Sequence, residues 1–487
     1  MLLWLVIAYI VVSVAIGLYA ATRVHNARDY IVAGRNLPFV FVLAMVFATW
    51  FGAETVLGIS ATFLDEGLRG LISDPLGAGL CLVLFGLIFA RPLYRMNLLT
   101  LGDYFRVRYN RQTEVALSLA IIISYLGWVG AQMAALGLVF HVLTDAAVSI
   151  NQGVCIGAAV VLVYTLFGGM WSVALTTFVQ MIVIILGLLY VTWQAGDMAG
   201  GFGNVVSKAA AEGKLEFLPT MEAADLLAWI AALITMMLGS IPQQDVFQRV
   251  NASRDERIAV WGTTVGGFAY ILFAAVPLML AYSATLIDPD MVARLMEEDS
   301  QLILPTLIVE HMPFTAQVIF FGALISVIMS TASGTLLAPS VTFTENILRG
   351  FWKNMSDRQL LASTRVAVVA FTACVTAYAV STEATIHHMV ESAYRVTLAG
   401  AFVPLVFGLF WKRANNLGAT LAIVLGLGTW LALELFVPEG DVEPQLYGVL
   451  VSALGMIVGG YVGAPTRHRP QAGHHHAATA THHTPHS

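Results

Sequence analysis

Long apolar stretches alternate with short polar connections along almost the whole chain. Most of the stretches contain about the 20 residues that an α-helix needs to cross the hydrocarbon core of a bilayer. We therefore predict an all-α polytopic membrane protein with 13 transmembrane helices, one for each stretch that can be delimited. Their predicted bounds are 2–22, 38–64, 72–90, 114–143, 148–167, 174–195, 225–242, 257–285, 313–342, 363–382, 386–411, 416–437 and 446–464.

The composition agrees with this pattern and excludes a soluble globular protein. Hydrophobic residues make up 58% of the 487 residues and charged residues only 11%, whereas soluble proteins contain about 25% charged residues. The first apolar run lacks a basic start and a small-residue cleavage site, so we predict a retained span and not a signal peptide. The cysteines Cys81, Cys155 and Cys374 fall in apolar segments and are interpreted as small core residues without a disulfide framework.

Most basic residues fall in every second connection between the predicted spans. The basic connections contain Arg23, Arg28, Arg35, Arg91, Arg95, Arg106, Arg108, Arg111, Arg249, Arg254, Arg257, Arg349, Lys353, Arg358, Lys412, Arg413, Arg467 and Arg469. The other connections contain Asp65, Glu66, Asp145, Asp288, Asp290, Glu297, Glu298, Asp299, Glu439, Asp441 and Glu443. Because Lys and Arg collect in cytoplasmic loops, we predict a multi-pass protein of the plasma or inner membrane, with its N-terminus outside and its C-terminus in the cytoplasm.

Two outer connections and the C-terminal tail are longer than the other connections. Residues 196–224 and 286–312 are expected to form small caps of amphipathic helix. Residues 465–487 are predicted to form a disordered, His-rich cytoplasmic tail. Clustered histidines can bind a transition metal, but a solvated tail is favoured because no carboxylate or cysteine completes a closed site. The clustered histidines are His474, His475, His476, His482, His483 and His486.

The most unusual apolar stretch is residues 47–58, in the middle of the second predicted span. It contains Gly52, two threonines and the carboxylate of Glu54 at a depth where an ionisable group is costly. Backbone inside a membrane departs from a helix only where it faces protein or a water-filled cavity, and there its carbonyl groups can bind a cation. The stretch therefore predicts a broken helix at a solute and ion site.

Five segments of the chain resemble, in order, segments of the sodium:solute symporter family, which includes transporters for proline, sugars, sialic acid and choline. These segments are 29–38, 47–58, 164–173, 241–250 and 328–333. The resemblance implies the leucine-transporter fold, in which two inverted repeats of five helices are surrounded by peripheral helices. On the predicted spans the repeats are 38–195 and 225–411, within one transmembrane domain of residues 1–464.

The resemblance also implies a sodium site where the broken helix meets the ninth predicted span. Its ligands would be the carbonyl oxygens of Ala48, Phe51 and Val327 and the hydroxyl groups of Ser330 and Thr331. Oxygen ligands suit a hard cation, although hydroxyl groups in membrane helices also bond carbonyls of their own helix or allow close packing. We predict one coupled sodium ion, because Thr177 stands where some family members have an aspartate of a second sodium site.

Polar and aromatic side chains of several spans are predicted to line a solute site beside the sodium site. Tyr125, Trp128 and Gln132 share one face of a helix by their spacing, and Pro242 breaks the seventh span. A pocket with tryptophan walls and a carboxylate suits an amine, through cation–π and charge contacts. The predicted lining residues are Trp50, Glu54, Thr55, Asp74, Tyr125, Trp128, Gln132, Gln243 and Gln244.

The choline-transporter branch of the family resembles this chain at Trp50 and Trp128, but it has a tryptophan where this chain has Gln243. An aromatic box for choline would therefore be incomplete, and Gln243 could bind a carboxylate or hydroxyl group instead. We expect an amino acid or a betaine- or choline-like amine as the solute. Two alternatives stay open: Trp128 could serve core packing alone, and Glu54 could serve as a gate without binding the solute.

Two pairs of oppositely charged residues stand four positions apart, which is the spacing of an ion pair on a helix. Asp245 and Arg249 are interpreted as a salt bridge at the inner end of the seventh span. Glu391 and Arg395, in the eleventh span, are predicted to pair as part of an outer gate.

The predicted function is sodium-driven symport of a small polar organic solute by alternating access, with sodium as the co-transported ion. The partners are then the solute, Na⁺ and the lipid bilayer, and no nucleic acid is expected. The alternative is a membrane sensor that binds solute without accumulating it. An enzyme is not expected because the chain lacks HExxH, GxSxG and P-loop motifs, and a channel would need rings of polar residues for selectivity.

Overall fold

Helices form nearly all of the computed structural model, which describes residues 1–352, 354–437 and 443–464. Within these ranges there is no β-strand, and an isolated β-bridge joins Leu37 to Ser253. The all-α prediction is therefore confirmed. The predicted His-rich tail, residues 465–487, lies outside the described residues.

The first part of the chain forms the helices α1 (Leu2–Ala20), η1 (Ala21–Arg23), α2 (Ala27–Val32), η2 (Ala33–Arg35), α3 (Phe39–Trp50), η3 (Glu54–Gly58), α4 (Ile59–Glu66), η4 (Gly67–Leu71), η5 (Ile72–Gly77), α5 (Ala78–Leu84), η6 (Phe85–Phe89), α6 (Ala90–Arg95), α7 (Leu101–Arg108), α8 (Arg111–Leu143), α9 (Ile150–Met198) and α10 (Phe202–Ala211). The η segments are short 3₁₀- or π-helices. The remaining helices are α11 (Ala223–Gly239), α12 (Gln244–Ala252), α13 (Glu256–Phe273), α14 (Ala275–Ile287), α15 (Pro289–Glu298), η7 (Ser300–Leu302), α16 (Ile303–His311), α17 (Phe314–Thr342), η8 (Phe343–Leu348), α18 (Arg349–Phe351), α19 (Asp357–Ser381), α20 (Ile386–Thr397), η9 (Leu398–Phe402), α21 (Val403–Phe410), α22 (Asn416–Phe436) and α23 (Pro444–Val462).

Polar residues at the ends of the apolar stretches fix where the long helices begin. Asn110 caps α8 by accepting a hydrogen bond from the backbone N–H of Thr113. Ser149 caps α9 in the same way, through the N–H of Gln152, and Ser356 caps α19. Such caps satisfy backbone N–H groups that the first helical turn leaves without a partner. Short polar connections thus delimit helices that are otherwise apolar.

In the described part of the chain, 10 helical segments are long and apolar enough to cross a membrane, or 11 if α11 and α12 form one span bent by 43°. Two of them, 54–95 and 150–198, contain 42 and 49 residues, although one crossing needs only about 20. Each contains a non-helical residue, Asp74 (φ −134°, ψ 124°) or Gly169 (φ 49°, ψ −138°). A polytopic membrane protein is thus confirmed, and the number of 13 helices stays a prediction.

The interruption of α9 depends on a glycine. Gly169 has a positive φ of 49°, which other residues rarely adopt. A Cβ atom at this position would lie 2.5 Å from the carbonyl oxygen of Tyr30 in α2. The close approach of α2 and the backbone conformation therefore both require Gly169, and they let one continuous helical segment change direction.

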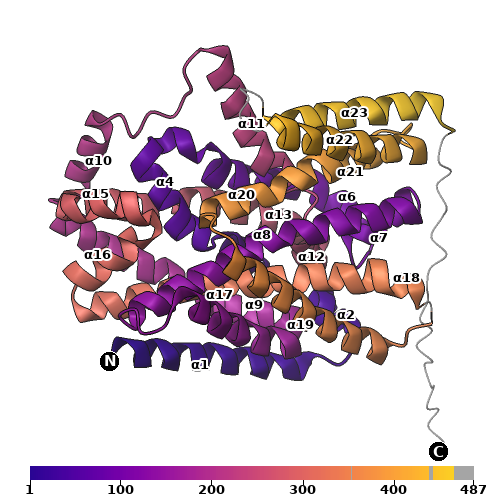
Figure 1. Cartoon of the computed structure of the whole chain (residues 1–487). Helices are drawn as coiled ribbons and strands as arrows, with labels where there is room; N and C mark the ends of the chain where they lie inside the picture. Colours follow the sequence, from indigo (N-terminus) through magenta and orange to yellow (C-terminus); the bar gives the residue numbers. More distant parts are fainter. Residues whose placement is uncertain (353, 438–442, 465–487) are drawn as a thin grey trace, which may run out of the picture.

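The helices lie side by side, with α1 along one edge and α22 packed against α23 at the opposite edge (Figure 1). Helices α8, α17 and α20 lie between these edges. Helices α10, α15 and α16 gather at the end of the bundle where the N-terminus lies, and α7 and α18 lie at the other end (Figure 1). The predicted caps at 196–224 and 286–312 are confirmed as helical, since they contain α10, α15 and α16.

The prediction that all three cysteines are core residues is wrong for two of them. Cys81 is buried, but Cys155 and Cys374 are exposed on the surface of the protein. Lipid chains are as apolar as the protein core. The apolar character of a segment therefore does not tell which of its residues face protein and which face the bilayer.

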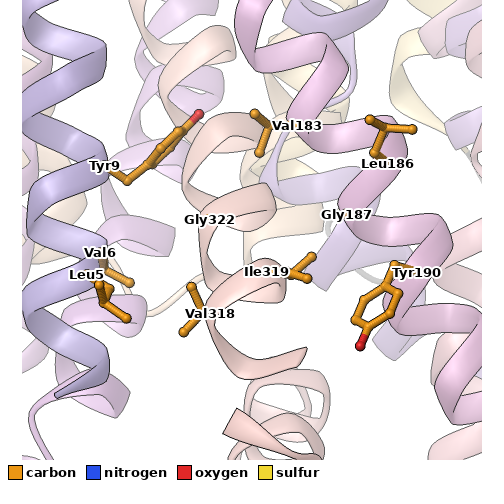
Figure 2. Close-up of a pocket in the computed structure, with 10 residues that line it drawn as sticks. All are labelled: Leu5, Val6, Tyr9, Val183, Leu186, Gly187, Tyr190, Val318, Ile319 and Gly322. Carbon is orange, nitrogen blue, oxygen red and sulfur yellow. The ribbon is translucent and has the colours of Figure 1, made fainter. Parts of the chain in front are cut away.

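An apolar groove of about 490 Å³ opens between α1, α9 and α17 (Figure 2). Tyr9 of α1 reaches across beside it and forms a hydrogen bond with Ser326 of α17. The groove is lined by Leu5, Val6, Tyr9, Val183, Leu186, Gly187, Tyr190, Val318, Ile319 and Gly322. None of these side chains is charged, and Leu5 and Leu186 are exposed at the protein surface, so the groove is not suited to a polar solute.

Candidate functional site

The broken helix predicted at residues 47–58 is confirmed. Helix α3 ends at Trp50, and η3 begins at Glu54. Between them, the N–H of Gly52 donates to the carbonyl of Trp50 (3.0 Å), and the N–H of Ala53 donates to Oε1 of Gln132 (3.0 Å). In a continuous helix these two N–H groups would bond the carbonyls four residues earlier. The break therefore leaves carbonyl groups of the last turn of α3 available for other partners.

A second break lies between α11 and α12. The two helices meet at a bend of 43°, across a segment that contains Pro242. Proline has no N–H and does not fit inside a helix. The chain thus presents two broken helices, and their ends bring polar groups into the apolar interior.

The predicted sodium ligands of α3 and α17 lie together. The hydroxyl of Ser330 donates to the carbonyl of Ala48 (2.7 Å) and to that of Val327 (2.9 Å), and the hydroxyl of Thr331 donates to Val327 (3.1 Å). Phe51 follows Ala48 by three positions, at the break itself. All five residues have an exposed fraction of 0%. This oxygen cluster has the ligand chemistry that a small hard cation requires. The bonds from Ser330 and Thr331 to Val327 also show the alternative that the sequence left open, since they lie within one helix.

Four aromatic side chains form a continuous cluster beside the break. The ring of Trp50 lies 5.5 Å from that of Trp128 and 6.3 Å from that of Tyr394, measured between ring centroids. Trp128 also contacts Tyr394 (5.8 Å) and Tyr125 (6.1 Å). None of the four is more than 2% exposed. The aromatic cluster, Trp50, Tyr125, Trp128 and Tyr394, therefore joins α3, α8 and α20.

Glu54 is held by two of the residues with which it was predicted to line a site. Its carboxyl group accepts hydrogen bonds from Nε1 of Trp128 (2.9 Å) and Nε2 of Gln132 (2.7 Å). Oε1 of Gln132 accepts the N–H of Ala53. Gln132 thus links the broken backbone to the carboxyl group, and the ring N–H of Trp128 bonds the same group.

Asp74 and Thr55 are linked through a tyrosine of α13. The hydroxyl of Tyr270 donates to Oδ1 of Asp74 and lies 3.0 Å from Oγ1 of Thr55. Asp74 and Thr55 are both buried. The structure therefore brings these two predicted residues to the same side of the broken helix, with Tyr270 between them.

The interpretation of Asp245 and Arg249 as a salt bridge is confirmed, but its location at the inner end of a span is wrong. The two side chains are 3.3 Å apart and only 0% and 1% exposed. Asp245 accepts hydrogen bonds from Nε1 of Trp50 (3.0 Å) and from the hydroxyl of Tyr125 (2.6 Å). The pair therefore lies in the interior and contacts the aromatic cluster. The sequence suggested that the pair lies at the end of a span, but the break before α12 places it in the interior of the protein.

The two glutamines after Pro242 point to different places. Nε2 of Gln243 donates to the hydroxyl of Ser124 (3.0 Å), one position before Tyr125. By contrast, Oε1 of Gln244 accepts the N–H of Leu101 (2.8 Å) at the start of α7. The side chain of Gln244 thus bonds the start of α7, and its place in the solute site stays a prediction.

Glu391 and Arg395 form the predicted ion pair, with 3.7 Å between their charged atoms. Arg395 also lies 3.5 Å from Glu434 of α22. Both members of the predicted pair are about one-fifth exposed. Arg395 directly follows Tyr394 of the aromatic cluster, so the pair lies next to that cluster along α20.

The sequence did not indicate three residues of this region as part of the site. Tyr394 and Tyr270 are single tyrosines in helical segments and carry no motif. Asp245 was assigned to an ordinary helix pair. One sequence feature could have pointed to them, although weakly. Each is a polar or amphipathic side chain in a membrane segment, where such groups are uncommon. Their spacing in the sequence does not show which other helices they contact.

Comparison with known proteins gives consistent results. The sequence profile of the sodium:solute symporter family matches residues 30–426. The chain is 28% identical over 466 residues to the high affinity choline transporter 1 of Homo sapiens, with 91% of this chain and 77% of that protein covered. It is 26% identical over 482 residues to the osmoregulated proline transporter OpuE of Bacillus subtilis (strain 168), with 92% of each covered. These relatives are transporters, so the sensor alternative has no support.

Solved structures show the same fold. A Na⁺-coupled sialic acid symporter in a substrate-bound outward-open state superimposes with a TM-score of 0.83 at 16% identity, over 95% of this chain and 98% of that one. A nucleobase-cation-symport-1 family transporter superimposes with a TM-score of 0.56 at 15% identity, over 91% and 96%. The leucine-transporter fold is therefore confirmed. Because the family profile covers most of the chain, the protein belongs to the sodium:solute symporter family and is a sodium-coupled solute symporter.

Proposed function

We propose that this symporter imports a small solute with a positively charged amine group, of the choline or betaine type, and binds it in the aromatic cluster. The observation that carries this proposal is the mutual contact of Trp50, Tyr125, Trp128 and Tyr394 next to buried carboxyl groups. Aromatic faces attract a cation through their quadrupole, and quaternary ammonium groups are bound by such cages. In this conformation the rings contact each other, so they must separate to admit the solute.

The charges around the aromatic cluster favour a cation over an anion. Two buried acidic residues, Glu54 and Asp245, bond residues of the cluster, and the buried Asp74 is linked to the same broken helix through Tyr270 and Thr55. The buried basic residue bonded to Asp245 is Arg249. The guanidinium of Arg249 already bonds Asp245 and Thr49. A solute carboxylate, as in betaine or proline, would therefore depend on uncharged donors such as the amide groups of Gln132 and Gln243. An amine supplies the positive charge that buried acidic groups in a membrane require.

Tyr394 weakens the objection that Gln243 raised against choline. The box expected from the sequence lacked a ring at position 243, but Tyr394 adds a fourth ring from α20. The similarity to the choline transporter supports the same solute class. The similarity to the proline transporter OpuE over 92% of the chain supports proline as a second candidate, for which Gln132 and Gln243 provide amide hydrogen bonds.

For the coupled ion, we propose that the carbonyls of Ala48, Phe51 and Val327 and the hydroxyls of Ser330 and Thr331 hold sodium. The contact of Ser330 with Ala48 supports this, because it joins the broken helix to α17 through oxygen atoms only. Moving one unit charge through 100 mV releases about 2.3 kcal/mol. For a solute without net charge, such as betaine, this corresponds to roughly 50-fold accumulation, at about 1.4 kcal/mol per factor of ten.

We further propose that one sodium ion is coupled. Thr177 and its neighbour Gln180, one helical turn on, are buried and have no hydrogen-bond partner in the part of the chain that the structure describes. Neither provides a carboxylate. A second sodium ion at this position would lack an anionic ligand, and hard cations are most strongly held by such ligands.

The arrangement of the helices supports the proposed repeats, 38–195 and 225–411, within a transmembrane domain of residues 1–464. The first helix of each repeat is the broken one, α3–η3 and α11–α12, and paired interruptions of this kind mark inverted repeats. The N-terminus lies at the same end as α10, α15 and α16 (Figure 1). This supports an outer N-terminus in the plasma or inner membrane, with the arginine-rich α7 on the cytoplasmic side.

Uptake into proteoliposomes tests the proposal. Choline, betaine, proline and glucose would each be offered with an inward sodium gradient and with a potassium gradient as control. We expect choline or betaine to accumulate with sodium alone, and the double substitution Ser330→Ala and Thr331→Ala to abolish this accumulation. Accumulation of proline alone would select the second candidate. Sodium-dependent binding without accumulation of any of the four solutes would contradict the proposal.

A further inference from the structure

A buried ion pair lies between the two clusters proposed to hold sodium and solute. Asp245 and Arg249 stand four residues apart on α12, with 3.3 Å between Oδ2 and Nη1. We infer that they form a positioning pair that transmits sodium binding to the solute site. The inference rests on the proposed function and deepens it, since it names the residues through which one site affects the other.

On the solute side, both oxygens of Asp245 hold aromatic rings. Oδ1 accepts the hydroxyl of Tyr125 (2.6 Å), and Oδ2 accepts Nε1 of Trp50 (3.0 Å). The backbone N–H of Asp245 donates in turn to the hydroxyl of Tyr125 (2.8 Å). Hydrogen bonds to an ionised carboxylate are stronger than neutral ones and fix the geometry of their donors. Asp245 therefore sets the orientation of two of the four rings.

On the sodium side, Arg249 holds the last turn of α3. Nη2 donates to the hydroxyl of Thr49 (2.7 Å), and Nε donates to the carbonyl of Met45 (3.3 Å). Thr49 directly follows Ala48, whose carbonyl accepts the hydroxyl of Ser330. A shift of the backbone at Ala48 on sodium binding therefore moves a residue that Arg249 contacts.

The charge of the pair matters as much as its contacts. The guanidinium of Arg249 contacts the residue next to a proposed sodium ligand, and an uncompensated positive charge there would repel the ion. Asp245 compensates this charge at 3.3 Å. The pair thus allows a basic side chain to hold α3 beside the sodium cluster without opposing the binding of sodium.

A purely stabilising role makes a different prediction. Removing one partner of a buried ion pair leaves an uncompensated charge and strongly destabilises a protein, whereas replacing both partners by neutral residues is often tolerated. If the pair only stabilises the fold, the double variant Asp245→Asn with Arg249→Met recovers both folded protein and normal coupling. If it positions the two clusters, the double variant recovers folded protein but not the coupling.

The measurement is the KM for choline uptake into proteoliposomes at low and at saturating sodium. In the unmodified protein we expect KM to fall as sodium rises, within the roughly 5- to 150-fold range of typical site-to-site coupling. In the double variant we expect the ratio of the two KM values to approach one. The matched control is Glu345→Gln with Arg349→Met, which removes a second ion pair four residues apart in sequence, with 2.6 Å between its charged atoms, in η8 and α18. That variant should keep the ratio of the unmodified protein.

A second variant keeps the test decisive if the double variant does not fold. Tyr125→Phe removes only one hydroxyl, which bonds Asp245, and we expect it to reduce the ratio at least threefold. An unchanged ratio in every folded variant that breaks these contacts would overturn the inference while leaving the proposed function intact. Failure of the proposed function is distinguishable, because the unmodified protein would then show no sodium-dependent uptake of choline or betaine.

Discussion

The hydroxyl of Ser330 donates a hydrogen bond of 2.7 Å to the carbonyl of Ala48, across 282 positions of sequence. This contact joins the end of a broken helix to the middle of α17. It exists because the N–H of Gly52, which would bond Ala48 in a continuous helix, donates to Trp50 instead. To bind a sodium ion at this point, the Ser330 hydroxyl would keep its proton and turn it away from Ala48, so that both oxygens could act as ligands.

The first prediction concerns Ser330. Replacing it by alanine removes one proposed ligand and the bridge between α3 and α17. We expect the sodium concentration for half-maximal uptake to rise at least about 10-fold. This is the smallest loss of affinity that is typical when a residue supporting a metal site is mutated. Solute uptake at saturating sodium should change less. The measurement is the sodium dependence of uptake into proteoliposomes.

Ser333→Ala is the matched control for this experiment. Its hydroxyl donates to the carbonyl of Ser330 (3.3 Å), so it is buried in the same helix but is not a proposed ligand. We expect its sodium dependence to stay within about twofold of the unmodified protein. Equal losses in the two variants would mean that helix packing, and not ion binding, explains the hydroxyl groups of α17.

The second prediction concerns the charge of Glu54. Glu54→Gln keeps the size of the side chain, and its carbonyl oxygen can still accept Nε1 of Trp128. The variant loses the negative charge that an amine would face. Losing one partner of a buried charged contact costs about 2 kcal/mol or more, so we expect the KM for choline to rise roughly 30-fold.

Proline is the comparison solute for the Glu54→Gln variant. It carries a carboxylate as well as an amine, so the lost attraction to its amine is partly offset by lost repulsion of its carboxylate. The KM for proline, where it is transported, should therefore rise much less than the KM for choline. Equal increases for both solutes would remove the charge argument and leave Glu54 with the role of a gate.

The sequence predicted the break at 47–58 because polar residues in a membrane segment have few explanations. It also indicated which residues would gather at α3 and α17, since the resemblance names both halves of that cluster. Helical spacing correctly put Tyr125, Trp128 and Gln132 on one face. These successes share a cause: each depends on residues within one segment, or on a segment pair already known from a family.

The sequence did not predict contacts that depend on how separate helices meet. Tyr394 is an isolated tyrosine on α20, and nothing in its spacing indicates that it faces Trp50. Asp245 and Arg249 have the spacing of an ordinary surface pair, and only the break before α12 moves them into the interior. Cys155 and Cys374 face outward. The sequence could not indicate this, because lipid and protein core are equally apolar. Contacts between separate helices therefore depend on tertiary packing, which the local sequence pattern does not determine.

The third prediction separates the ring of Tyr394 from its hydroxyl. Tyr394→Phe keeps the aromatic face, whereas Tyr394→Leu removes it. A desolvated cation–π contact is worth about 2 kcal/mol, so the leucine variant should raise the KM for choline by roughly 30-fold. The phenylalanine variant should stay within about threefold. If both variants behave alike in choline uptake, the ring does not contact the solute cation.

The last prediction concerns the number of coupled sodium ions. At zero membrane potential, the solute gradient that stops net flux equals the sodium gradient if one ion is coupled, and equals its square if two are coupled. Proline or betaine, which carry no net charge, would be used if transported, so that any residual potential acts on the sodium ions alone. We expect the first relationship, because the region of Thr177 and Gln180 offers no carboxylate.

Thr177→Asp makes this prediction sharper. The substitution introduces a carboxylate one helical turn from Gln180, whose side-chain amide has no hydrogen-bond partner in the described chain. A carboxylate buried in a membrane is costly unless a cation accompanies it, so the variant should bind an additional sodium ion and shift the balance point toward the square of the sodium gradient. Thr176→Asp is the control, since the hydroxyl of Thr176 already bonds the carbonyl of Ser172 within α9 (2.7 Å). A squared relationship in the unmodified protein would show that neutral oxygens hold a second ion without the aspartate.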